Sequence, residues 1–214
     1  MEALSYFTAM AGTVAFAVTA VLAVSKRGID LFGACVLGIT TAIGGGTIRD
    51  LVLDVPVFWA TDLNYIWVGL ISSLATFVAL PFFKRKFIYL LLLYIDGFGA
   101  SLFAIQAMDK VWELNFGLPV APILLGVTTA IGGGVTRDVL AGRKTLIMSR
   151  ELYATPVLFG CILFSIASYV LPEYRATWAS VCIAIIFGIR SAAIHWKLSV
   201  PNWLMTQTAE DDLD

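Results

Sequence analysis

TTAIGGGTIRDL at residues 40–51 returns almost unchanged as TTAIGGGVTRDV at residues 128–139. The copies are 88 residues apart, and each lies in the middle of an apolar stretch long enough to cross a bilayer. Glycine frees backbone groups and lets another chain approach closely, which a bilayer tolerates only where protein or a water-lined cavity meets those groups. The pattern predicts a duplicated membrane protein in which each half contributes one broken helix. We place the pathway at the repeated glycines, which are Gly44, Gly45, Gly46, Gly132, Gly133 and Gly134.

Composition indicates a membrane protein and argues against other classes. Of 214 residues, 59% are hydrophobic and 14% are charged, and the mean hydropathy is +0.88, whereas soluble domains carry about 25% charged residues. The net charge of −1, without a basic stripe outside short loops, argues against nucleic acid as a partner. The sequence has one histidine, no set of metal ligands and no nucleophile with a base, so we expect neither an enzyme nor a bound metal or cofactor.

Charged residues and prolines divide the chain into seven apolar runs. Each is close to the ~20 residues that a helix needs to cross ~30 Å of hydrocarbon. The runs cover residues 5–24, 31–53, 64–82, 87–107, 120–141, 153–171 and 176–196. The sequence therefore predicts an all-α membrane protein with seven transmembrane helices.

The duplication extends beyond the glycines, since Tyr65, for example, aligns with Tyr153. Each repeat then holds three helices, and an odd number of crossings makes the second repeat enter the membrane upside down. We expect two inverted three-helix repeats followed by an unpaired helix and a polar tail. Their boundaries are 1–86 and 87–172 for the repeats, 173–198 for the seventh helix and 199–214 for the C-terminal tail.

Basic residues are concentrated on one side of the predicted helices. The other side carries only Arg49, Lys110 and Arg175, with acidic residues around them. The positive-inside rule therefore places the N-terminus outside the cell and the C-terminus in the cytoplasm. The basic residues of the cytoplasmic side are Lys26, Arg27, Lys84, Arg85, Lys86, Arg143, Lys144, Arg150 and Lys197.

Two Gly-Gly-Gly-x-x-Arg-Asp motifs, on the second and fifth of seven helices in a chain of this length, resemble the bacterial members of the trimeric intracellular cation (TRIC) channel family. The resemblance covers the chain up to about Lys197. It implies a multi-pass protein of the bacterial inner membrane that forms a homotrimer, with a pore in each protomer framed by kinked second and fifth helices. Such a pore passes monovalent cations, chiefly potassium, with sodium as the other candidate.

The resemblance leaves two points open. Animal relatives carry a lysine-rich motif that binds membrane lipid on these helices, whereas this chain has Gly-Gly-Gly and Arg-Asp there. Related bacterial sequences have also been regarded as carriers of small amino acids, so a secondary transporter of an amino acid such as glycine is the alternative function. A channel needs a continuous water path, whereas a carrier alternates access around a site near the bilayer midplane.

Charges inside the predicted helices are costly unless they are paired or hydrated. Arg49 and Asp50 follow the first set of glycines, and Arg137 and Asp138 follow the second. In one interpretation, these residues only pin helix ends at the membrane interface by snorkelling. In the other, they act as gates above and below a central constriction, where a paired arginine narrows the path until it swings aside.

Asp96 lies within the fourth predicted run, and no other charge is near it in sequence. Asp96 and Arg137 should share a depth in the membrane because both lie near the cytoplasmic side. An ion pair between them is one interpretation, and a cation-attracting site at Asp96 is the other. Arg190, inside the last predicted helix, is a competing partner for Asp96.

Threonines flank the glycines on both predicted helices. Their hydroxyl and carbonyl oxygens could coordinate a partly dehydrated cation. The candidates are Thr40, Thr41, Thr47, Thr128, Thr129 and Thr136.

Overall fold

The protein folds into helices along almost all of the chain. The computed structural model describes residues 2–82 and 85–201. The long helices are α1 Glu2–Val24, α2 Leu31–Val52, α4 Asn64–Ala79, α5 Arg85–Glu113, α6 Val120–Leu140, α7 Ala154–Val170 and α8 Arg175–His195. Four short elements lie between them: α3 Phe58–Thr61 and the 3-10 turns η1 Leu80–Phe82, η2 Leu146–Met148 and η3 Pro172–Tyr174.

The membrane class predicted from composition is confirmed. Six helices within the described residues are long and apolar enough to cross a membrane, and they are α1, α2, α4 with η1, α5, α6 and α8 with η3. The sixth predicted run, 153–171, forms α7, which is apolar but has only 17 residues. Residues 202–214 of the predicted polar tail lie outside the described residues, whereas Ser199 forms an isolated antiparallel bridge with Glu151.

The fourth helix is longer than its apolar run predicts. The run ends at residue 107, whereas α5 continues to Glu113. The helix can continue because charges near its end are paired: Lys110 Nζ lies 2.8 Å from Asp50 Oδ1, and Asp109 Oδ1 lies 2.6 Å from Arg175 Nη2. The charges at 109 and 110 were expected to mark a loop, and they belong to the helix instead.

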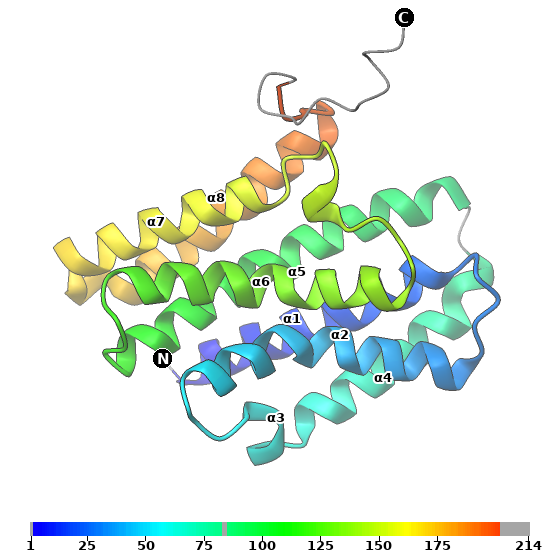
Figure 1. Cartoon of the computed structure of the whole chain (residues 1–214), viewed down its shortest axis with the longest axis horizontal. Helices are drawn as coiled ribbons and strands as arrows, with labels where there is room; N and C mark the ends of the chain where they lie inside the picture. The colour runs from blue at the N-terminus through cyan, green and yellow to red at the C-terminus, as the bar shows by residue number, and fades with distance from the viewer. Residues whose placement is uncertain (1, 83–84, 202–214) are drawn as a thin grey trace, which may run out of the picture.

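The helices pack into one bundle in which α2 and α6 lie side by side and cross at their glycines (Figure 1). These two helices run in opposite directions in Figure 1, with α2 starting at the right and α6 at the left. Helices α1 and α5 pack against them and against each other, α4 covers α1 and α2, and the α7–α8 pair packs on α5 and α6. The main apolar core between these helices contains Phe16, Ile105, Met108, Phe164 and Ile186.

The expected break at the glycines is absent, because both α2 and α6 are continuous helices across them. The glycines instead allow the two backbones to touch. A Cβ atom on Gly45 would overlap the carbonyl oxygen of Thr129, and one on Gly133 would lie 2.5 Å from the carbonyl oxygen of Thr41. The repeated glycines are therefore needed for close approach of α2 and α6 rather than for an interruption of the helix.

The two glycine helices end in the same backbone turn. Asp54 has a φ of 52° and Gly142, 88 residues later, has a φ of 58°. The carbonyl of Asp50 accepts a hydrogen bond from the amide of Val55 at 3.1 Å, and that of Asp138 accepts one from Arg143 at 2.8 Å. The duplication seen in the sequence thus extends to the path of the main chain beyond each motif.

Candidate functional site

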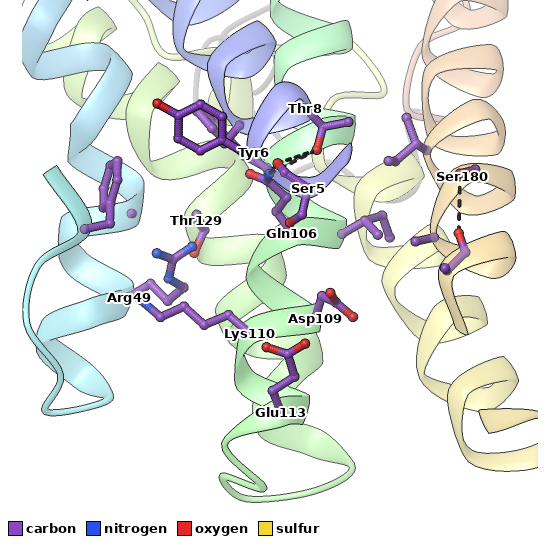
Figure 2. A pocket seen from close by; sticks show the side chains of 18 of the residues that line it. Ser5, Tyr6, Thr8, Arg49, Gln106, Asp109, Lys110, Glu113, Thr129 and Ser180 are labelled. Atoms are coloured by element: carbon purple, nitrogen blue, oxygen red, sulfur yellow. Dashed lines mark hydrogen bonds between the residues drawn. The ribbon is translucent and has the colours of Figure 1, made fainter. Parts of the chain in front are cut away.

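A cavity of about 740 Å³ opens at the end of the bundle where α2 finishes (Figure 2). We call this the Arg49 end, and the opposite end, where α6 finishes, the Arg137 end. Polar and aromatic side chains of α1, α4 and α5 line the cavity, including Tyr6, Tyr65 and Gln106. Its lining also includes Gly46 of α2 and Thr129 of α6, so the cavity extends to the crossing of the two glycine helices.

Two cations share one carboxylate at the wall of this cavity. Asp50 Oδ1 lies 2.8 Å from Arg49 Nη2 and 2.8 Å from Lys110 Nζ. Figure 2 shows the side chains of Arg49 and Lys110 next to each other, coming from α2 and α5. The Asp50 side chain is fully buried, while that of Lys110 is 32% exposed. The group of Arg49, Asp50 and Lys110, which we call the outer cluster, therefore carries one net positive charge.

The Arg137 end holds a corresponding cluster that is fully buried. Arg137 Nη1 lies 2.6 Å from Asp96 Oδ1, and Arg137 Nε lies 3.0 Å from Asp138 Oδ1. The same Nη1 donates a hydrogen bond to Thr19 Oγ1 at 3.0 Å. The group of Arg137, Asp96 and Asp138, which we call the inner cluster, carries one net negative charge. The predicted contact between Asp96 and Arg137 is present, and Arg137 does not snorkel to the membrane interface, since its side chain is 0% exposed.

Each motif aspartate also fixes the segment that follows its helix. Asp50 Oδ2 accepts a hydrogen bond from the amide of Phe58 at 2.9 Å, and Asp138 Oδ2 accepts one from the amide of Leu146 at 3.2 Å. Both bonds join residues eight positions apart. The Arg-Asp pair therefore has the same structural role in both repeats. Its aspartate pairs with the arginine and also accepts a hydrogen bond from the first residue of the next short helix.

Arg190 does not compete for Asp96 in this structure. Its Nη2 lies 3.3 Å from Glu151 Oε2, and its Nη1 donates to the carbonyl of Leu152 at 3.0 Å. Its guanidinium lies over the ring of Tyr153, with 5.1 Å between Cζ and the ring centroid. These contacts hold Arg190 beside the segment between α6 and α7, while Asp96 forms its ion pair with Arg137.

The threonines are less available to an ion than the sequence suggests. Thr40, Thr41, Thr47, Thr129 and Thr136 each donate the hydroxyl proton to the carbonyl four residues earlier. Among the predicted threonines and glycines, the described cavity lining includes Thr129 and Gly46. The remaining predicted positions pack at the helix crossing or outside the cavity.

Sequence reasoning missed several residues of the site. Lys110 was assigned to a loop, although it is the second cation on Asp50. Tyr153 was noted only as an aligned repeat position, although it is 2% exposed and packs beside Gly134. The sequence did carry a signal for Lys110. Asp50 lies at the end of an apolar helix, where a buried carboxylate needs more hydrogen-bond donors than Arg49 alone provides. No local pattern indicated that Tyr6, Tyr65 and Gln106 would meet in one cavity.

Three comparisons place the chain among known proteins. The family model for glycine transporters matches residues 6–81 and 93–169. The inner membrane protein YadS of Escherichia coli is 36% identical over 205 residues, which cover 95% of this chain and 98% of that protein. The crystal structure of a TRIC trimeric intracellular cation channel orthologue from Rhodobacter sphaeroides has a TM-score of 0.84 and 34% identity, covering 91% of this chain and 99% of that one.

A further TRIC cation channel structure has a TM-score of 0.80 and 31% identity, covering 94% of this chain and 98% of the other. The residues matched by the family model include both glycine motifs. They place the protein among membrane channels and transporters. The chain therefore belongs to the family that the glycine transporter model describes, and it is a bacterial member of the trimeric intracellular cation (TRIC) channel family.

Proposed function

We propose that this protein is a monovalent cation channel, permeable to potassium and sodium, with a pore in each protomer between α2 and α6. The observation that carries the proposal is the cavity of about 740 Å³, which enters at the Arg49 end and reaches Thr129 at the helix crossing. Its polar and charged lining can hold water and ions. Beyond the crossing, Gly134 lies beside the inner cluster, since a Cβ on it would lie 3.4 Å from Asp96 Oδ1 and 3.6 Å from Arg137 Nη2.

The inner cluster is a closed gate in this proposal. Arg137 fills the space between Asp96 and Asp138, and none of the three side chains is more than 3% exposed. When Arg137 leaves Asp96, two carboxylates face the path and attract cations. A positive side chain can therefore block a cation pore in one position and leave it strongly negative in the other. Arg49 and Asp50 form the corresponding constriction at the other end, where Lys110 keeps the net charge positive.

The glycine crossing is the element that moves with this gate. At the crossing, a Cβ on Gly132 would lie 3.3 Å from the Cα of Gly45, and one on Gly45 would lie 3.3 Å from the amide nitrogen of Gly133, so backbone meets backbone there. Smooth faces of this kind can slide or separate by a small distance without repacking a core. Opening would then bring the carbonyl and hydroxyl oxygens of Thr41, Thr47, Thr129 and Thr136 to the path.

The membrane arrangement follows the duplication. We propose seven transmembrane helices, with α7 as the shortest, arranged as inverted repeats at 1–86 and 87–172 and followed by α8 within 173–198. The antiparallel crossing of α2 and α6 supports this inversion. We propose that the Arg137 end faces the cytoplasm, with the N-terminus outside, because the basic residues gather at that end. The protein would sit in the bacterial inner membrane as a homotrimer, with lipid around its apolar outer faces.

Secondary transport of a small amino acid such as glycine is the second candidate. The matching family model is named for glycine transport. The cavity also contains both cationic side chains, Arg49 and Lys110, and acidic ones, Asp109 and Glu113, which suit a zwitterion. The similarity to TRIC channel structures favours the channel.

A flux assay in proteoliposomes distinguishes the two functions. We expect purified protein to release trapped potassium down its gradient and to leave external glycine outside, with protein-free liposomes as the control. Potassium release rules out a carrier that moves glycine alone. Saturable glycine uptake without potassium release would contradict the channel.

A further inference from the structure

Glu151 joins three separate parts of the chain at the Arg137 end. It lies in the segment 141–153 that connects α6 to α7. Its Oε1 accepts a hydrogen bond from the Tyr89 hydroxyl on α5 at 3.0 Å, and its Oε2 lies 3.3 Å from Arg190 Nη2 on α8. Its backbone pairs with Ser199 after α8 in an antiparallel bridge, beside a hydrogen bond from the Val200 amide to the Arg150 carbonyl at 2.9 Å.

The same segment is attached to the inner cluster. Near its start, the amide of Leu146 donates to Asp138. At its end, the Tyr153 side chain is buried, and a Cβ on Gly134 would lie 2.8 Å from its hydroxyl oxygen and 3.4 Å from Asp96 Oδ1. The Tyr153 ring lies under the guanidinium of Arg190. A displacement of segment 141–153 therefore changes the surroundings of Asp96 and Arg137.

The first repeat provides a comparison within the same molecule. Tyr65, which aligns with Tyr153, lines the open cavity at the Arg49 end, whereas Tyr153 is 2% exposed. Leu63 occupies the position that corresponds to Glu151, and its side chain is largely exposed. The partner Arg190 belongs to α8, which follows both repeats. The contacts of Glu151 thus exist at one end only, and that end is the closed one.

The strength of these contacts suits a reversible element. Arg190 is almost fully buried, whereas the Glu151 side chain is 31% exposed. A carboxylate that reaches water can leave its partners without being stranded in an apolar environment. Arg190 also donates to the Leu152 carbonyl of the same segment, so the Glu151 ion pair is one of two contacts that attach the segment to α8.

We propose that Glu151 is a positioning residue for the gate: together with Ser199 and Val200 it holds segment 141–153, and with it Tyr153, against the inner cluster. Release of Glu151 raises the open probability of the pore and leaves the conductance of the open pore unchanged. This inference rests on the proposed channel function. It assigns to α8 and the residues after it the control of a gate that is built from α5 and α6.

The first test replaces Glu151 with glutamine and records unitary currents from purified trimers in planar bilayers. Removal of one partly exposed ion pair should raise the open probability roughly two- to fivefold. The unitary conductance should stay at the wild-type value, which separates a positioning role from a place in the path. Glu173→Gln is the matched control, because Glu173 is an exposed acid at the other end and makes no ion pair or hydrogen bond within the described residues.

The second test fixes the segment instead of releasing it. Arg150 and Val200 face each other beside the antiparallel bridge, where Cα atoms are about 5.5 Å apart and a disulfide can form. Oxidised Arg150→Cys/Val200→Cys protein should have a lower open probability than the wild type, and a reductant should restore it. The wild type is the control for the reductant, since Cys35, Cys161 and Cys182 are buried.

The outcomes distinguish this inference from the function on which it rests. An absence of unitary currents in the wild type would remove the channel proposal itself. Wild-type currents with an unchanged open probability in both Glu151→Gln and the oxidised double-cysteine variant would overturn the role of Glu151. A change in unitary conductance in Glu151→Gln would also overturn it, because the residue would then act within the path.

Discussion

Arg137 Nη1 lies 2.6 Å from Asp96 Oδ1, and neither side chain is exposed. The two residues come from α6 and α5 and are 41 positions apart. Asp96 has no charged counterpart in the first repeat, where the equivalent position falls near Thr8. The same helix, α5, therefore adds a carboxylate, Asp96, to the Arg-Asp pair of the second repeat and a cation, Lys110, to that of the first.

Replacement of Asp96 with asparagine should destabilise the protein. Arg137 would keep Asp138 but lose its shortest ion pair in a fully buried position. Breaking a buried pair by removal of one partner costs about 3–5 kcal/mol. We expect a clear fall in the midpoint of thermal unfolding in detergent, together with altered cation flux.

The double variant Asp96→Asn/Arg137→Gln is the control for this prediction. It removes both charges of this pair but also leaves the buried Asp138 without its cation, so we expect it to be no more stable than the single variant. A single variant as stable as the wild type would show that the pair is not buried from water in the working protein. A double variant more stable than the single would show that Asp138 does not depend on Arg137 for its charge.

The glycines at the crossing should be intolerant of even one methyl group. A Cβ on Gly45 overlaps a backbone oxygen, and one on Gly133 comes within 2.5 Å of another, so neither can be relieved by a side-chain rotation. Gly45→Ala and Gly133→Ala should lower the free energy of unfolding by about 1–3 kcal/mol, although alanine has a higher helix propensity than glycine. Thermal unfolding of the purified variants measures this.

Two alanine variants serve as matched controls. A Cβ on Gly44 would lie 3.5 Å from Thr136 Oγ1, which is an ordinary contact, and one on Gly188 would meet nothing within 4 Å. Both variants should be as stable as the wild type or slightly more stable. The larger change Gly45→Leu/Gly133→Leu should block cation flux while trimers still form, and full flux in that variant would refute the path along the crossing.

Neutralisation of Lys110 should raise the cation conductance. Lys110 lines the cavity and gives the outer cluster its net positive charge, so its loss removes repulsion at the entrance. The increase should be larger in 20 mM than in 1 M potassium chloride, because salt screens an exposed charge, with a Debye length of about 10 Å at 0.1 M and about 3 Å at 1 M. Unitary currents of Lys110→Met measure it, with the exposed Lys26→Met as control. An equal effect of both variants would argue against the cavity as the entrance.

Assembly can be tested independently of conduction. The mass of the purified protein in detergent, corrected for bound detergent, should correspond to three chains. Each chain has a mass of 23.2 kDa. A monomer or dimer would contradict the proposed homotrimer, as would a structure with an open pore on the threefold axis.

The sequence was informative where period and spacing carry the signal. The apolar runs gave the helix ends within a few residues, except at α5, where paired charges allow the helix to continue through Asp109 and Lys110. Shared depth was sufficient to pair Asp96 with Arg137, because a buried charge requires a partner.

The sequence was less informative about features that depend on distant contacts. A glycine run permits either a helix break or a close helix contact, and only the position of the facing helix shows that contact is used here. The threonine hydroxyls donate to carbonyl groups of their own helix, and the spacing of the threonines in the sequence did not indicate this. The contacts of Glu151 join α5, α8 and a segment after α8, so they became visible only in the folded chain.

The central claim is that a cation path runs through each protomer from the Arg49 end to the gate at Arg137. Unitary current recording from purified protein in planar bilayers, with a potassium chloride gradient, tests this claim most directly. The account predicts discrete current steps whose reversal potential lies near that of potassium. Saturable uptake of glycine with no unitary steps, or steps that reverse near the chloride potential, would contradict it.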